Sequence, residues 1–130
     1  IDLDVFEEII ICPSNPFVSI NPMLQLTKLQ QHLTKYPEKV TVISPIVNSN
    51  SLKGPTAKMM TELGQEVSVM SIAAFYKDFS KRIFIDTSDK NDAIPIAEMG
   101  FEVCNANIVM NNFQSKVDLA QVIVDHLEEH

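Results

Sequence analysis

The sequence predicts an α/β fold in which helices cover both faces of a parallel β-sheet, giving three layers. Four short segments rich in Ile, Val or Phe suit buried parallel strands, namely Glu8–Cys12, Val40–Ser44, Arg82–Asp86 and Phe101–Asn105. Stretches with helical spacing separate these segments, and a last one follows them. Because parallel strands need crossover connections, this alternation favours right-handed crossovers and a sheet covered on both sides.

The segment after the second strand predicts a short helix with recognisable ends. Gly54 and Pro55 fit its N-cap and first-turn positions, and Gly64 is placed to end it in a left-handed conformation. The apolar side of this helix consists of Met59, Met60 and Leu63.

Three further helices are expected in the second half of the chain. Ser68 suits the cap of a helix that runs through Phe79, and Asp89 or Asn91 suits the start of one that ends at Gly100. In the last helix a cap at Ser115 precedes an apolar stripe with spacings of three and four, made of Val117, Ala120, Val124 and Leu127. We expect this stripe to pack on the sheet.

The composition fits one domain, or part of one, since 130 residues with 45% hydrophobic content can bury a core. The apolar runs are far shorter than the roughly 18 residues of a membrane span. The first residues lack the basic start of a signal peptide, so we expect a cytoplasmic protein with no membrane partner. Residues 1 to 6 resemble the tail of a helix and contain no starting methionine, which suggests a piece of a longer protein.

The net charge of −7 argues against general binding to nucleic acid, but the charge is unevenly distributed. Residues 9 to 61 contain five lysines and a single acid, Glu38. An anionic ligand is therefore expected to prefer this part of the chain.

The cysteines and histidines show no metal-ligand spacing. Cys12 and Cys104 each follow or end a predicted strand, and we expect both to be buried and reduced rather than joined in a disulfide. The three histidines are expected on the solvated surface, namely His32, His126 and His130.

The first candidate site segment follows the first strand, where two prolines bracket a Ser-Asn pair. Ser14, Asn15 and Ser19 offer hydroxyl and amide groups on a stiff turn at the carboxyl end of the strand, where α/β sheets bind ligands. The alternative is an ordinary Asx or Ser turn that caps the next helix. For Asn15 the residues alone leave both interpretations open.

The second candidate segment runs from Ser44 to Lys58 and contains no acid. It brings Lys53, Gly54 and Lys58 to the start of a helix, where cations oppose the helix dipole by about 0.3–1 kcal/mol each. A bound phosphate would offset this cost, although surface lysines remain the alternative. The spacing matches neither a Walker A loop nor a dinucleotide-binding glycine pattern.

Other candidate chemistry is sparse. Asp86 ends the third predicted strand and suits either a metal or sugar ligand or, more commonly, a cap for the next turn. The sequence supplies no Ser/His/Asp or Cys/His catalytic set, so no catalytic residue is assigned.

Two motifs together resemble the 2-phospho-L-lactate transferase family, CofD, along nearly the whole chain. The first is Pro-Ser-Asn-Pro-x-x-Ser-Ile-x-Pro at residues 13–22. The second is Ser-Pro-Ile-Val at residues 44–47, followed by Leu-Lys-Gly-Pro-x-x-Lys-Met-Met at residues 52–60. Phe-Ile-Asp at 84–86 and Met-Gly-Phe-Glu-Val at 99–103 also match.

The resemblance implies a Rossmann-like enzyme of deazaflavin coenzyme F-420 biosynthesis, of which this chain is the C-terminal part. Such an enzyme moves a 2-phospholactyl or phosphoenolpyruvyl group from a guanylyl diphosphate donor to the alcohol Fo and releases GMP. The anionic ligand would be bound by Ser14, Asn15, Ser19, Ser44, Lys53, Gly54 and Lys58.

The same resemblance implies Mg²⁺ held by aspartates of an N-terminal half that this chain lacks, so that the chain alone is expected to be inactive. A homo-oligomer is also expected. The alternative function is a non-catalytic module that binds phosphate or a nucleotide sugar, as in the related YvcK-like regulatory proteins.

Overall fold

The computed structural model describes residues 2–51 and 55–129 and contains a four-stranded sheet with the order β1-β2-β5-β6. The strands are β1 (Ile9–Ile11), β2 (Val40–Ile43), β5 (Arg82–Asp86) and β6 (Glu102–Ala106). All neighbouring strands are parallel, and the register pairs Ile10 with Thr41, Val42 with Ile83, and Phe84 with Cys104. The four predicted strands are confirmed to within one residue at each end.

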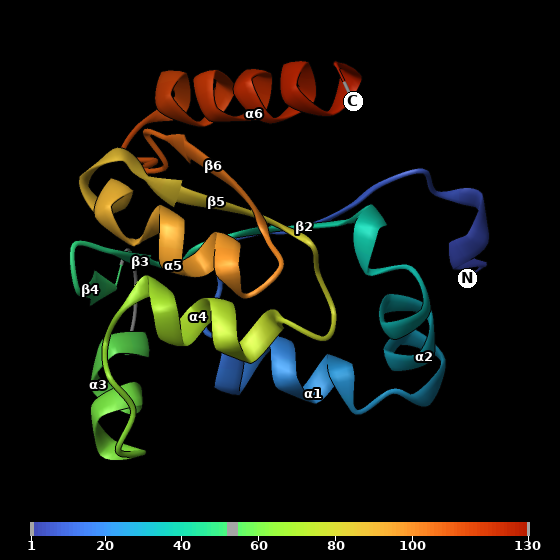
Figure 1. Ribbon diagram of the computed structural model, residues 1–130, viewed down its shortest axis with the longest axis horizontal. Helices are drawn as coiled ribbons and strands as arrows, with labels where there is room; N and C mark the ends of the chain where they lie inside the picture. Colours follow the sequence, from blue (N-terminus) through green and yellow to red (C-terminus); the bar gives the residue numbers. More distant parts are fainter. Residues whose placement is uncertain (1, 52–54, 130) are drawn as a thin grey trace.

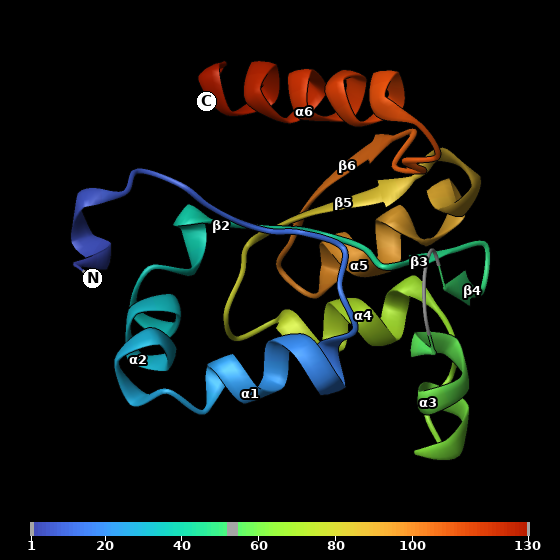
Figure 2. The ribbon, with the colours of Figure 1, turned by 180° about the vertical axis from the view of Figure 1, so that it is seen from behind.

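Helices cover both faces of this sheet, which confirms the three-layer α/β fold (Figure 1). Helix α6 lies on one face, while α1, α4 and α5 lie on the other. The helices are α1 (Asn21–Leu24), α2 (Thr27–Lys35), α3 (Thr56–Glu62), α4 (Val69–Tyr76), α5 (Ala93–Glu98) and α6 (Phe113–Glu128). Short turns of 3-10 helix occur at Leu3–Val5, Pro37–Lys39 and Thr87–Asp92, and a π-helical turn occurs at Pro16–Ile20. Figure 2 shows the chain leaving β1 and turning away from the sheet toward α1.

Alternate residues of the central strands point into two separate cores. Val42, Ile83 and Ile85 belong to the larger core, which includes residues of α1, α4 and α5. Ile43 and Phe84 belong to the smaller core beneath α6. Successive side chains of a strand point to opposite faces, so one buried sheet supports both layers of helices.

Helix α6 differs from the prediction at its start and in its buried face. Its N-cap is Asn112, whose side chain accepts from Ser115 N at 2.8 Å, while Ser115 Oγ accepts from Asn112 N at 3.1 Å. Ser115 is therefore the third helical residue of a capping box rather than the cap. The buried side chains are Leu119 and Ile123, since they are the ones that reach the core around Phe84.

The predicted stripe on α6 lies mainly in solvent. Val117 and Val124 are each 43% exposed, and Ala120 is exposed as well. Apolar residues occur around most of this helix, so spacing alone could not select the face, whereas the longer Leu and Ile side chains fill the space above Phe84.

The other predicted helix ends are partly confirmed. Gly64 and Gly100 follow α3 and α5 with positive φ angles of 71° and 102°, and Ser68 caps α4 through a bond from Ser71 N. The helix predicted to start at Asp89 or Asn91 instead begins with the 3-10 turn, which Asp86 caps through Ser88 N. The first residues form a 3-10 turn at Leu3–Val5 rather than the tail of an α-helix.

Part of the polar segment after β2 is a β-hairpin. Strands β3 (Ile46–Val47) and β4 (Asn50–Ser51) pair antiparallel, and the turn residues Asn48 and Ser49 have φ angles of 49° and 62°. Positive φ at both central residues is the geometry of a type I′ hairpin turn. Among residues 2–51 and 55–129, no helix is both long enough and apolar enough to cross a bilayer.

Candidate functional site

A cavity of about 460 Å³ lies beyond the carboxyl ends of the parallel strands. Its walls come from the segments that follow β1, β2 and β6 and from the first turns of α3 and α6. The lining residues are Pro13, Ser14, Asn15, Pro45, Thr56, Val109, Met110, Asn111, Asn112, Phe113 and Lys116. This is the edge at which open α/β sheets bind ligands, because loops and helix N-termini converge there.

Asn15 both caps the chain locally and lines this cavity. Its Oδ1 accepts from Phe17 N at 2.9 Å and from Val18 N at 3.3 Å, at the start of the π-helical turn. Its Nδ2 lies 3.2 Å from Met59 Sδ of α3. The capping interpretation is thus confirmed for Asn15, and the cap fixes the side chain at the cavity wall beside Ser14.

Ser19 and Ser44 do not line the cavity. Ser19 is exposed within the π-helical turn. Ser44 is buried, where its Oγ donates to Ile46 O at 2.9 Å and accepts from Ile46 N at 3.1 Å. These bonds hold the entry into the hairpin, so Ser44 shapes the loop after β2 rather than facing a ligand.

Lys58, the described lysine of the second candidate segment, does not line the cavity. Lys58 is exposed, and its Nζ lies 3.7 Å from Glu62 Oε1, one turn further along α3. The Lys58 side chain thus lies toward Glu62 rather than toward the start of α3, and its ligand role stays a prediction. Lys53 and Gly54 lie outside the described residues, so their ligand role stays a prediction.

Two lining residues that sequence reasoning missed supply the chemistry of the cavity. Lys116 lies in the first turns of α6, the helix that follows β6, and lines the cavity. Thr56, at the first position of α3, is 1% exposed, and its Oγ1 finds no hydrogen-bond partner among the described residues. The run of asparagines after the fourth strand was the available signal for this wall, by the carboxyl-end rule.

The electrostatics of the cavity favour an anion. Lys116 is the charged member of the described lining, which contains no carboxylate. The N-terminal turn of α6 contributes a partial positive charge to the same wall through Asn112 and Phe113. Mg²⁺ prefers carboxylate oxygens and water, so the described lining does not fit a Mg²⁺ site.

Asp86 holds in place the segment that leads into one wall of the cavity. It is buried, and its carboxylate accepts from Ser88 N at 3.0 Å, from Ser88 Oγ at 2.7 Å and from Ile108 N at 3.2 Å. Burial raises the pKa of Asp86, but the bonds from Ser88 and Ile108 outweigh burial and hold this pKa below its ordinary value. Asp86 thus ties the end of β5 to the segment that continues into the cavity wall, as a cap rather than a ligand.

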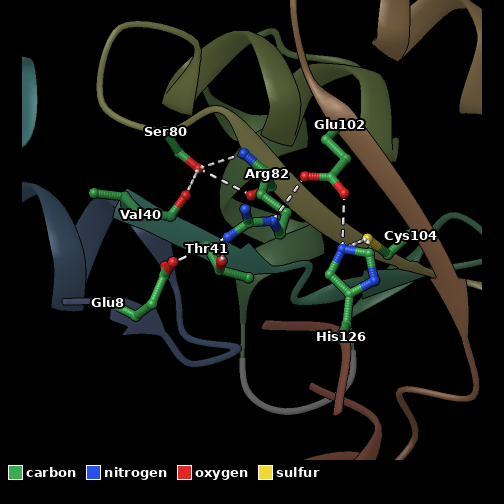
Figure 3. Close-up of polar contacts among 8 residues, drawn as sticks. All are labelled: Glu8, Val40, Thr41, Ser80, Arg82, Glu102, Cys104 and His126. Carbon is green, nitrogen blue, oxygen red and sulfur yellow. Dashed lines mark hydrogen bonds and ion pairs between the residues drawn. The ribbon is translucent and has the colours of Figure 1, made fainter. Parts of the chain in front are cut away.

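A second polar cluster lies at the other end of the strands, on the face that α6 covers (Figure 3). Arg82 is 9% exposed, and its guanidinium contacts Glu102 Oε2 at 2.8 Å, Thr41 Oγ1 at 3.0 Å and Glu8 Oε2 at 3.4 Å. The other oxygen of Glu102 lies 2.8 Å from His126 Nε2, which is 3.4 Å from Cys104 Sγ.

The surroundings of this cluster shift two pKa values. Burial raises the pKa of Glu102, but the hydrogen bonds from Arg82 and His126 outweigh burial and hold the pKa below its ordinary value. Burial raises the pKa of the Cys104 thiol to about 11. Cys104 is therefore a thiol at neutral pH.

The expectation that the histidines lie in solvent is wrong for the two that the structure describes. His126 is half-buried against β6, and the His32 side chain is 9% exposed, with Nδ1 3.3 Å from Asp4 Oδ1. His32 of α2 and His126 of α6 both lie on the inner side of their helix. Their distance along the chain from the cysteines could not reveal this orientation. Cys12 is exposed rather than buried, and it lies directly after the edge strand β1.

The parallel sheet with its cavity at the carboxyl edge defines a Rossmann-like α/β protein. The family model of 2-phospho-L-lactate transferase CofD matches residues 4–121, and the chain therefore belongs to the CofD family.

Several relatives are similar to this chain over most of its length. Proteins named 2-phospho-L-lactate transferase are 34% identical in Methanosarcina mazei, over 91% of this chain and 38% of the relative. In Methanocaldococcus jannaschii the identity is 40%, over 90% of this chain and 36% of the relative. In Methanococcoides burtonii the identity is 34%, over 94% of this chain and 39% of the relative. The chain thus spans less than two fifths of the length of these relatives.

Proposed function

We propose that the chain is the C-terminal part of a transferase of coenzyme F-420 biosynthesis. The whole enzyme would move a 2-phospholactyl or phosphoenolpyruvyl group from a guanylyl diphosphate donor to the alcohol Fo and release GMP. Membership of the CofD family and the name shared by the relatives support this reaction. The rest of the enzyme would be an N-terminal half that this chain lacks.

The observation that carries the role of this chain is the cavity lined by Ser14, Asn15, Thr56 and Lys116, whose described lining contains no acid. A hydroxyl, an amide and an ammonium group are donors for the oxygens of a phosphate. Thr56 lines the cavity and its buried Oγ1 has no partner among the described residues, so a phosphate oxygen would supply one. We assign the phosphate-bearing part of the donor, or of the released GMP, to this cavity.

In this reaction the hydroxyl oxygen of Fo attacks the phosphorus atom that carries the lactyl group. The bond between that phosphorus and the bridging oxygen breaks, and the electron pair leaves with GMP. Lys116 would stabilise the negative charge that builds up on the phosphate oxygens. The described lining contains no carboxylate or imidazole, so we assign the base for the Fo proton, and any Mg²⁺, to the N-terminal half.

The proposal is tested by restoring activity in trans. The chain is mixed with the N-terminal part of the Methanocaldococcus jannaschii relative, and GMP release from the guanylyl donor is followed with Fo present. We expect release only when both parts are present. Lys116→Ala should lower the rate about 10-fold or more, because it removes a charge-assisted hydrogen bond to phosphate. Lys28→Ala, an exposed lysine of α2, is the matched control and should not change the rate.

A folded two-part complex that binds the donor yet releases no GMP would contradict the transferase proposal. Direct titration of the chain with GMP, Fo and a sugar nucleotide then separates the alternatives. Preference for the sugar nucleotide without affinity for Fo would instead favour a binding or regulatory module.

A further inference from the structure

We propose that Glu102, Cys104 and His126 form a Zn²⁺ site between β6 and α6. This site is separate from the cavity, since Glu102 opens β6 whereas the cavity lies beyond the end of that strand. The three residues offer one oxygen, one sulfur and one nitrogen atom, which all lie within 4.8 Å of one another. Mixed ligand sets of this kind are typical of Zn²⁺ in proteins.

Two of the three distances between the ligand atoms are near those of a tetrahedral zinc site, and the third, between Glu102 and Cys104, is within 4.8 Å. Bonds of about 2.3 Å to sulfur and about 2.0 Å to nitrogen and oxygen place sulfur and nitrogen about 3.5 Å apart. In the structure, Cys104 Sγ and His126 Nε2 are 3.4 Å apart. The 2.8 Å between His126 Nε2 and Glu102 Oε1 must widen by roughly 0.5 Å to reach the tetrahedral spacing. Small side-chain rotations supply that change.

The cluster is held in place by neighbours on the same face of the sheet (Figure 3). Glu102 and Cys104 are two residues apart along β6, so both side chains point toward α6. Arg82 Nε fixes Glu102 through its second oxygen at 2.8 Å, and the ring of Phe84 packs edge-on against the imidazole of His126 at 5.7 Å. Such outer contacts orient the first ligands of metal sites.

A hollow of about 420 Å³ gives an ion access to the cluster from solvent. Cys104 and His126 line it together with the acidic residues Asp125 and Glu129. The hollow leaves room for water as the fourth ligand, and its two acids attract cations toward the thiol and imidazole.

The charges balance when the ion binds. Arg82 opposes a cation nearby, but Glu8 and Glu102 both contact its guanidinium. Binding of Zn²⁺ displaces the proton of the Cys104 thiol to solvent, which leaves a thiolate and a neutral imidazole as ligands. The four charged side chains then carry a net charge of −2, which cancels the charge of the ion. They are Arg82, Glu8, Glu102 and the Cys104 thiolate, so the site is not left with an uncompensated buried charge.

Titration of the 130-residue protein with Co²⁺, a spectroscopic substitute for Zn²⁺, tests the proposal. We expect one equivalent to bind, with a thiolate-to-cobalt charge-transfer band that Zn²⁺ abolishes by displacement. Cys104→Ser should remove the band and weaken Zn²⁺ binding at least about 100-fold. Loss of a residue that only orients a metal ligand already lowers metal affinity about 10- to 100-fold. Cys12→Ser is the matched control, because Cys12 is the other, exposed cysteine. A band that persists in Cys104→Ser, or disappears in Cys12→Ser, would overturn the site.

A second measurement needs no variant and remains informative if Cys104→Ser fails to fold. Alkylation of the two cysteines of the unmodified protein is followed by mass spectrometry, with and without one equivalent of Zn²⁺. We expect Zn²⁺ to slow the alkylation of Cys104 at least about 10-fold, because a metal-bound thiolate is shielded, and to leave Cys12 unchanged. Equal rates at Cys104 with and without Zn²⁺ would show a hydrogen-bonded network only and would overturn the proposal.

Discussion

Thr56 and Asp86, two buried polar residues at the carboxyl edge of the sheet, differ in their hydrogen bonding. Both are buried, but Asp86 accepts three hydrogen bonds, whereas Thr56 Oγ1 has no partner among the described residues. A satisfied buried group stabilises the fold, and an unsatisfied one costs free energy that a ligand can recover. We therefore assign a structural role to Asp86 and propose a ligand role for Thr56.

Thr56→Val should separate stability from binding, because valine has nearly the same shape and no hydroxyl. We expect the free energy of unfolding to stay equal or to rise by about 1 kcal/mol, since the unpartnered group is lost. The affinity for GMP, measured by calorimetry, should fall about 10-fold. Thr61→Val is the control on the same helix, because its exposed Oγ1 donates to Ala57 O and does not face the cavity. Unchanged GMP affinity in Thr56→Val would remove Thr56 from the site.

Asp86→Asn should lower stability at neutral pH and change its dependence on pH. The pKa of Asp86 is lower in the folded protein than its ordinary value. Its ionised form therefore contributes stability above about pH 4, and this contribution is lost as the pH falls through the folded pKa. We expect a deficit of about 1–2 kcal/mol at pH 7 that narrows in acid. Urea unfolding of both proteins at several pH values measures it, and a constant deficit would contradict the charge effect.

At the scale of elements, α6 links the two polar clusters. Its first turns supply Asn112 and Lys116 to the cavity, and its last turns place His126 beside Glu102 and Cys104. In the described part of the chain, the apolar side chains by which this helix packs on the sheet core are Leu119, Ile123 and, partly buried, Leu127. The position of both clusters therefore depends on a narrow apolar contact.

Leu119→Ala should test which face of α6 carries that contact. Leu119 is 4% exposed, so its truncation should cost about 2–5 kcal/mol of unfolding free energy. Val117→Ala, on the face that the spacing predicted, should cost less than about 1 kcal/mol, because Val117 is 43% exposed. Thermal and urea unfolding compare the two variants. Equal losses would mean that α6 packs through both faces in solution.

At the scale of the whole molecule, the cavity joins the segments that follow β1, β2 and β6 with the first turns of α3 and α6, so the ligand we propose would stabilise the folded chain as a unit. GMP at about 100 times its dissociation constant should raise the free energy of unfolding by about 2.7 kcal/mol. For Lys116→Ala, urea unfolding at the same GMP concentration should show a clearly smaller increase in the free energy of unfolding. An equal gain in both proteins would place GMP outside this cavity.

The sequence was sufficient for the sheet but not for the site. Each strand is a short apolar run with its own burial signal, and Gly64 and Ser68 are local signals as well. Of the seven residues proposed to bind the ligand, the structure brings only Ser14 and Asn15 to the cavity, while Lys53 and Gly54 lie outside its described residues. Lys116 was missed because it belongs to no ligand-binding motif, and the asparagines shortly before it were the signal available for this wall.

The amino-acid sequence by itself determined the α/β class, the strand positions and the family, because these follow from local patterns of burial, caps and motifs. Tertiary structure alone decided that Asn15, Thr56 and Lys116 share one cavity and that Glu102, Cys104 and His126 share one cluster. The proximity of these residues depends on which face each helix buries and on which strands become neighbours. Packing sets both, and it brings together residues that are far apart along the chain.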